Sequence, residues 1–237
     1  MNPPQKAARY SYQPNKLNYC GPENAHEKLL NFVNNPVQEE EAEIVSLLKQ
    51  FSALHPYLEL IAQKNEIENE FDEKVINAYW TGNELLEHEW GEDLRELLRE
   101  KLTGPHLLPQ KISEKLAAEL PNGLLPHHSF NVLYVNFVTK KVSPIVQNLS
   151  NCLVKWGKVV DENELKAKTV KLISENNEFK LKEEIRKFEN PFGIPLQKND
   201  LISLHWGIAV EKIPETELKN LKKATQINLE AVNSQGR

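Results

Sequence analysis

The sequence predicts an α+β protein in which a helical N-terminal domain precedes a small β-barrel with a C-terminal helix. Apolar residues recur with the helical period from about residue 23 to residue 120. After residue 150 the pattern changes to short apolar strands, and a last amphipathic run follows Pro214. Several short strands followed by one helix are typical of a closed or nearly closed barrel.

These changes of pattern divide the chain into three parts. We expect an N-terminal arm and helical domain over residues 1–125, a strand and linker over residues 126–150, and the barrel with its helix over residues 151–237. A chain of 237 residues is long enough for one large domain or two small ones with a sizeable core.

The first segment, Met1–Pro22, contains four prolines. We therefore expect an extended arm without a helix. Tyr10, Tyr12 and Tyr19 would anchor this arm to the body of the protein.

The helical domain is predicted from one clear apolar stripe and from helix start signals. Ile44, Leu47, Leu48 and Phe51 follow the i, i+3, i+4, i+7 spacing of one buried helix face. Further helices are expected to start near Asp72 and Pro109. The region from Glu23 to Leu120 should thus be all helical.

Strands are expected where apolar and β-branched residues gather between turn signals. Asn176-Asn177 should form the turn of a hairpin. The expected strands are Ser129–Thr139, Cys152–Val160, Lys168–Ser174, Glu178–Leu181 with an extension over Lys182–Phe188, and a long strand Leu201–Ile213.

Composition excludes several classes of function. The net charge of −5 argues against a nucleic-acid partner, which needs a basic face. No apolar run is long enough to span a bilayer, and the N-terminus lacks the apolar core of a signal peptide, so we expect a cytoplasmic protein without a membrane partner. Two cysteines without a C-x-x-C pair argue against a disulfide scaffold and a self-contained zinc site.

Cys152 and His205 are the candidate metal ligands. A thiolate binds iron, copper(I) or zinc, and at the start of a strand Cys152 would lie partly exposed on the barrel rim. We expect His205 to lie near it at the same end of the barrel. The plainer interpretations are a small buried hydrophobic residue for Cys152 and a hydrogen-bonded core histidine for His205.

The remaining candidates carry weaker signals. His127 and His128 are adjacent, so in a strand they would point to opposite faces and would not line one site together. Cys20 precedes Gly21-Pro22 and is a second thiol that could approach Cys152 from the other part of the chain.

Two sequence blocks resemble the small HypC/HupF-type chaperones of [NiFe]-hydrogenase assembly. Asn151–Val160, NCLVKWGKVV, is similar to the start of those proteins, which has Met-Cys, an apolar strand and a glycine-containing turn. Asp200–Ile213, DLISLHWGIAVEKI, resembles their Asp-x-Val-x-Val-His-x-Gly-Phe-Ala-x-x-Lys-Ile pattern. Trp156 stands where the family has proline, and Asn199 where it has glycine.

The resemblance covers the last third of the chain and implies both fold and function. It implies an OB-like barrel in a non-enzymatic assembly chaperone that takes part in hydrogenase maturation. The essential cysteine of that family falls on Cys152 and its histidine on His205. The partners would be an iron-carrying scaffold protein and the hydrogenase large-subunit precursor, and the transient cofactor would be iron with cyanide and carbonyl ligands.

Two other functions remain open. Cys152 activated by His205 would make a thiol-dependent enzyme, although no oxyanion motif or third orienting residue is evident. A barrel that has lost its metal role would be a protein-interaction module, and the departures at Trp156 and Asn199 keep this interpretation open.

Overall fold

The computed structural model describes residues 1–139 and 141–235. Residue 140 in the expected linker and residues 236–237 at the end of the expected barrel part lie outside the described residues. The elements are α1 (Pro3–Lys16), α2 (Ala25–Asn34), α3 (Gln38–Leu48), α4 (His55–Lys64), α5 (Glu73–Trp80), η1 (Glu84–Leu86), α6 (Gly91–Glu96), η2 (Leu97–Lys101), α7 (Gln110–Ala118), α8 (His128–Phe130), η3 (Asn131–Val135), α9 (Val146–Cys152), β1 (Lys155–Asp161), β2 (Lys166–Glu175), β3 (Glu178–Lys187), β4 (Leu201–His205), β5 (Ile208–Lys212) and α10 (Glu215–Asn233).

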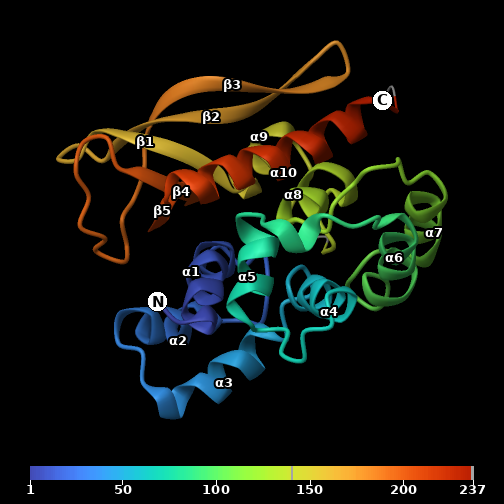
Figure 1. The fold of residues 1–237 in the computed structure, drawn as a ribbon, viewed down its shortest axis with the longest axis horizontal. Coiled ribbons are helices and arrows are strands. Elements are labelled where there is room, and N and C mark those ends of the chain that lie inside the picture. The colour runs from blue at the N-terminus through green and yellow to red at the C-terminus, as the bar shows by residue number, and fades with distance from the viewer. Residues whose placement is uncertain (140, 236–237) are drawn as a thin grey trace.

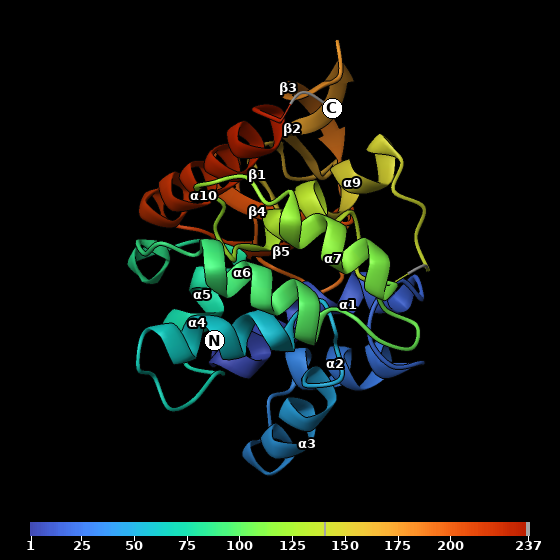
Figure 2. The same cartoon turned by 90° about the vertical axis from the view of Figure 1, so that its right-hand side faces the viewer.

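The molecule is an α+β structure in which a five-stranded antiparallel sheet lies over a layer of helices (Figure 1). The strand order is β3-β2-β1-β4-β5, and α10 runs between the sheet and the helices that come earlier in the chain. The view in Figure 2 shows the same layering from the side. Among the described residues β3 and β5 are the sheet edges, so the sheet is open and the expected closure into a barrel is not formed.

The expected helical region between Glu23 and Leu120 is confirmed. Ile44, Leu48 and Phe51 are almost fully buried, whereas Leu47 is only half-buried. The side chain of Asp72 accepts a hydrogen bond from the backbone N–H of Lys74 and so caps α5, as its sequence position predicts.

The expectation of an extended N-terminal arm is wrong, because Pro3–Lys16 forms the buried helix α1. Pro3 and Pro4 occupy the first turn, where a helix needs no backbone N–H donor, and Pro14 lies in the last turn. The Asn2 side chain accepts a hydrogen bond from the Gln5 N–H at 2.9 Å and caps the start. Of the three tyrosines expected to anchor this segment, Tyr10 and Tyr12 are buried and Tyr19 is half-buried.

The expectation of a strand over Ser129–Thr139 is also wrong. Its first part forms the short helix α8 and the π-helical segment η3, which together run from His128 to Val135. Almost every residue here is buried, so the apolar run lacks the one-sided periodicity that separates strand from helix. Because this segment is helical, the side chain of His128 points in a different direction from the one that a strand would give it.

The strands of the C-terminal part are largely confirmed. β2 and β3 form the expected hairpin, with Asn176 and Asn177 both at positive φ (54° and 63°), as a tight two-residue turn requires. The expected long strand Leu201–Ile213 instead folds back on itself as β4 and β5. Trp206 and Gly207 form the turn with φ of 51° and 83°.

A single cluster of buried apolar side chains contains residues from α1 to α10, so the helical layer and the sheet share one core. Gly82 (φ 77°) allows the end of α5 to approach α10, since a Cβ there would lie 3.1 Å from the Asn220 carbonyl oxygen. Within residues 1–139 and 141–235 no helix combines the length and the apolar character needed to cross a membrane.

Candidate metal centre

Three buried side chains from three separate elements converge between the helical layer and the sheet. His128 in α8, Cys152 at the end of α9 and His205 at the end of β4 each place one metal-binding atom within 4.8 Å of the others. The structure thus brings together Cys152 and His205, the two candidates from the sequence. It also adds His128, which the sequence did not associate with them.

Cys152 is positioned by the last turn of α9 rather than by the start of a strand, so that expectation is wrong. The carbonyl of Asn151 accepts a hydrogen bond from the Trp206 N–H at 2.8 Å, which ties the end of α9 to the β4–β5 turn. The Ser150 hydroxyl accepts a hydrogen bond from the Leu172 N–H at 3.0 Å and ties α9 to β2. These two bonds hold Cys152 next to His205.

His205 has a defined tautomer with one nitrogen left free. Its Nδ1 lies 2.8 Å from the carbonyl oxygen of Tyr10, which can only accept, so Nδ1 carries the proton. Its Nε2 is buried and has no hydrogen-bond partner among the described residues. A lone pair therefore remains on Nε2 and is available to a cation.

His128 carries its proton on the other ring nitrogen. Its Nδ1 lies 3.0 Å from the Tyr79 hydroxyl, and that hydroxyl also makes a very short contact with the carbonyl of Ala53. Its Nε2 lies 3.0 Å from the carbonyl oxygen of Cys152, which can only accept, so Nε2 carries the proton and Nδ1 accepts from Tyr79. The same Nε2 lies 3.7 Å from Cys152 Sγ, which places it beside the thiol.

Burial keeps both imidazoles neutral. It lowers the pKa of His205 to about 4 and lowers the pKa of His128 well below its ordinary value, with a further contribution from His205. At neutral pH the Nε2 lone pair of His205 therefore stays unpaired in the cavity. An unpaired buried acceptor is an unfavourable arrangement that a bound cation would relieve.

The spacing also fits a transition-metal ion. Metal–sulfur bonds of about 2.3 Å and metal–nitrogen bonds of about 2.0–2.1 Å, at trigonal or tetrahedral angles, place sulfur and nitrogen about 3.5–3.8 Å apart. The distance of 3.7 Å between Cys152 Sγ and His128 Nε2 lies within that range. One thiolate and two imidazoles suit copper, zinc or iron.

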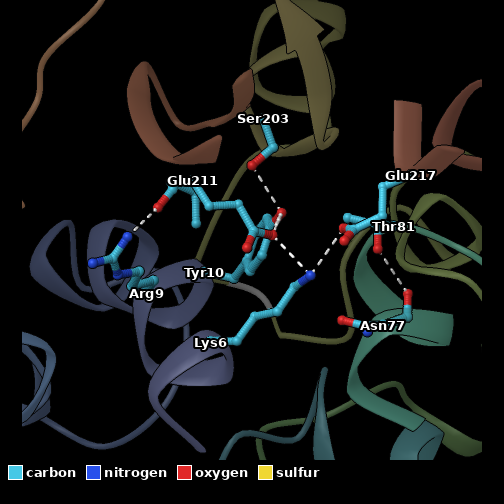
Figure 3. Close-up of polar contacts among 9 residues, drawn as sticks. Lys6, Arg9, Tyr10, Asn77, Thr81, Ser203, Glu211 and Glu217 are labelled. Atoms are coloured by element: carbon cyan, nitrogen blue, oxygen red, sulfur yellow. Dashed lines mark hydrogen bonds and ion pairs between the residues drawn. The ribbon is translucent and has the colours of Figure 1, made fainter. Parts of the chain in front are cut away.

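A buried polar network supports the His205 side of the cluster from α1 (Figure 3). The Tyr10 hydroxyl lies 2.8 Å from both Ser203 Oγ and the Glu211 carboxylate. The ammonium of Lys6 lies 2.9 Å from Glu211 and 3.1 Å from Glu217. These contacts fix α1 to β4, β5 and α10, and so hold the Tyr10 carbonyl that sets the His205 tautomer.

The three ligand residues line a cavity of about 40 Å³ whose other walls are mainly apolar and aromatic, among them Phe51, Trp80 and Trp206. Among the described residues that line it, none is Asp, Glu, Lys or Arg. A cavity of this size holds a small ion or a few atoms of ligand. The centre is therefore small and lies in mainly apolar surroundings.

Cys152 is only 7% exposed, so the expectation of a partly exposed thiol on a barrel rim is wrong. Burial raises its pKa above the ordinary thiol value. Cys20 lines the same cavity and is half-buried, which brings the two thiols to one site although they lie far apart in the chain. His127, by contrast, caps α8 and lies outside the cluster.

The sequence contained only a partial signal for His128. As a strand residue next to His127 it had no reason to face Cys152. Asn228 of α10 donates to the Leu125 carbonyl and the Ser129 hydroxyl, at 3.1 and 2.9 Å, and so fixes the chain on both sides of His128. This contact joins residues about one hundred positions apart, and no local pattern reveals it.

Fold and site define an α+β protein with a buried Cys-His-His cluster between its helical layer and its sheet. The chain belongs to the DUF6390 family, a family of unknown function whose model matches residues 3–237. No curated protein and no solved structure matches the chain.

Proposed function

We propose that the protein binds a soft transition metal through His128, Cys152 and His205 and handles that metal during the assembly of a metallocentre in a partner protein. The observation that carries the proposal is the convergence of the three ligand atoms within 4.8 Å, with the unpaired Nε2 of His205 among them. A metal displaces the thiol proton, and His128 binds it through Nε2 in the tautomer whose proton lies on Nδ1.

The particular form of this function comes from the resemblance of the C-terminal third to HypC/HupF chaperones. In this form the cytoplasmic partners are an iron-carrying scaffold and the precursor of a [NiFe]-hydrogenase large subunit. The cargo is iron with cyanide and carbonyl ligands, for which a thiolate is a suitable soft ligand. The open sheet would correspond to an opened form of the OB-like barrel. The meeting of Cys152 and His205, one from each resembling block, supports this form.

The geometry favours a metal ligand over a catalytic nucleophile at Cys152. A thiol nucleophile needs a lowered pKa and access to substrate, whereas burial raises the pKa of Cys152 and closes it in an apolar cavity. A metal ion removes this obstacle because a coordinated thiol is deprotonated outright. The role is therefore that of a metal-handling protein rather than an enzyme.

The test compares metal binding by the parent protein with four single variants under anaerobic conditions. Cys152→Ser should lose stoichiometric binding, and His205→Ala and His128→Ala should each weaken it about 10- to 100-fold. Cys20→Ser is the matched thiol control and should bind as the parent does. Circular dichroism would show that each variant is folded.

The same variants address the proposed partner. In a strain that lacks this gene, Cys20→Ser should restore hydrogenase activity and Cys152→Ser should not. Full restoration by Cys152→Ser would refute metal handling and leave a protein-interaction module. Metal binding without any effect of the gene on hydrogenase activity would retain the metal site and refute the hydrogenase client.

A further inference from the structure

We infer that the cavity around His128, Cys152 and His205 selects its metal by charge: it accepts a soft metal unit whose net charge is +1 or less and disfavours a bare divalent ion. This inference rests on the metal-binding role proposed above and specifies which metal units that role concerns. It follows from the ligand set, from the walls of the cavity and from the charges that surround it.

The ligand set neutralises one positive charge and no more. Cys152 releases its thiol proton when the metal–sulfur bond forms, and the two neutral imidazoles contribute no charge. A monovalent ion such as Cu(I) therefore leaves the centre neutral. A bare divalent ion leaves one uncompensated positive charge in an apolar cavity, where such a charge is costly.

The surroundings offer no carboxylate as a second negative charge. None of the described residues that line the cavity is Asp or Glu, and the second thiol there, Cys20, lies outside the three converging ligand atoms. The buried carboxylate of Glu211 is held by Lys6 and by the Tyr10 hydroxyl outside the cavity. Lys155 adds a positive charge near His205. It lies in β1 opposite Leu204 of β4, the neighbour of His205 in the chain. Its charge contributes to the lowered pKa of His205.

The number of protein ligands also favours a monovalent ion. Three protein ligands complete the coordination of Cu(I), a soft ion that thiolates select, whereas zinc requires a fourth. The cavity has room for one water beside the metal, so size alone does not exclude zinc. Charge is therefore the property that discriminates between the two ions.

Asn131 allows a direct test of charge without a change of shape. It lines the same cavity three residues after His128, is 2% exposed, and its Oδ1 has no hydrogen-bond partner among the described residues. Asn131→Asp places a carboxylate at this position, and Asn131→Ala controls for the loss of the amide. Lys155→Met removes the positive charge behind His205 and serves if Asn131→Asp does not fold.

The experiment measures the affinities for Cu(I) and Zn(II) separately, by anaerobic competition with a coloured chelator for each ion. Asn131→Asp should raise the affinity for Zn(II) about 10- to 100-fold, because a unit charge acts over a few ångströms at an effective dielectric constant of about 20. The affinity for Cu(I) should change less than about threefold, since the Cu(I)–thiolate pair is neutral. Lys155→Met should shift the Zn(II) affinity in the same direction by about 3- to 10-fold.

The outcomes separate this inference from the metal-binding proposal. If Zn(II) affinity stays constant in Asn131→Asp and Lys155→Met, or if Cu(I) affinity rises as much as Zn(II) affinity, charge selection is overturned while the metal site stands. If the parent protein binds neither Cu(I) nor Zn(II), the proposed function itself fails. If the affinity for Zn(II) rises as much in Asn131→Ala as in Asn131→Asp, the effect comes from the space that the amide leaves and not from charge. That result would also overturn the inference.

Discussion

Lys155 should destabilise the folded protein at neutral pH, and its replacement by methionine should relieve that cost. The side chain is 2% exposed. Burial and, to a smaller extent, the charge of Arg186 lower the pKa of Lys155 from 10.5 to about 8, against an opposing contribution from the Glu184 carboxylate. A depression of this size corresponds to about 3 kcal/mol in the free energy of unfolding, at about 1.4 kcal/mol for each pH unit.

The sign of the pH dependence follows from the direction of this change. Because the folded pKa of Lys155 is the lower one, the unfolded chain binds more protons between pH 8 and pH 10.5. The cost is full below pH 8 and disappears as the pH rises to 10.5. Lys155→Met should thus be about 3 kcal/mol more stable than the parent at pH 7 and nearly equal to it at pH 10.5.

Urea unfolding at several pH values between 7 and 10.5 measures this difference directly. Lys168→Met is the matched control, because the Lys168 side chain on β2 is half exposed and pairs with Glu183 at 2.9 Å. It should change the free energy of unfolding by less than about 1 kcal/mol. A constant difference between Lys155→Met and the parent, or a loss of stability at pH 7, would refute the reasoning.

Three further predictions concern stability, each measured by urea unfolding. Leu48→Ala should cost about 2–5 kcal/mol because Leu48 is fully buried, and Leu47→Ala should cost less because Leu47 is half-buried; equal costs would contradict this assignment of the α3 core face. Gly82→Ala should cost about 1–3 kcal/mol more than Gly193→Ala, since both glycines have positive φ but only Gly82 approaches α10; equal losses would show that the close approach is unimportant. Lys6→Met should cost about 3–5 kcal/mol because it leaves a buried carboxylate unpaired; a loss below 1 kcal/mol would mean that water replaces the ammonium.

The metal centre could be predicted only in part from the sequence. Cys152 and His205 stand in two recognisable blocks, and the structure places them side by side. His128 was missed because SFNVLYVNFVT has the composition of a strand, yet its first residues form the helices α8 and η3. A helix that is buried on all sides has no polar face, so periodicity could not separate the two structures.

The N-terminal helix is a second case in which the local sequence did not identify a buried helix. Prolines in Pro3–Lys16 suggested an extended arm, but two of them occupy the first turn of a helix. That helix is stable because it is buried between the other helices and the sheet, where Tyr10 and Lys6 reach Glu211. The contacts that decide this structure join positions about two hundred residues apart.

By itself the sequence determined the features that depend on neighbouring residues. These are the succession of helices, the hairpin at Asn176-Asn177, the start of α10 after Pro214, and thus the α+β class. Local periodicity, capping and turn chemistry suffice for each of them. The tertiary structure alone decided that the sheet stays open, that His128 joins Cys152 and His205, and that mainly apolar side chains surround the centre. Burial and ligand convergence depend on which distant elements pack together, and packing is a property of the whole chain.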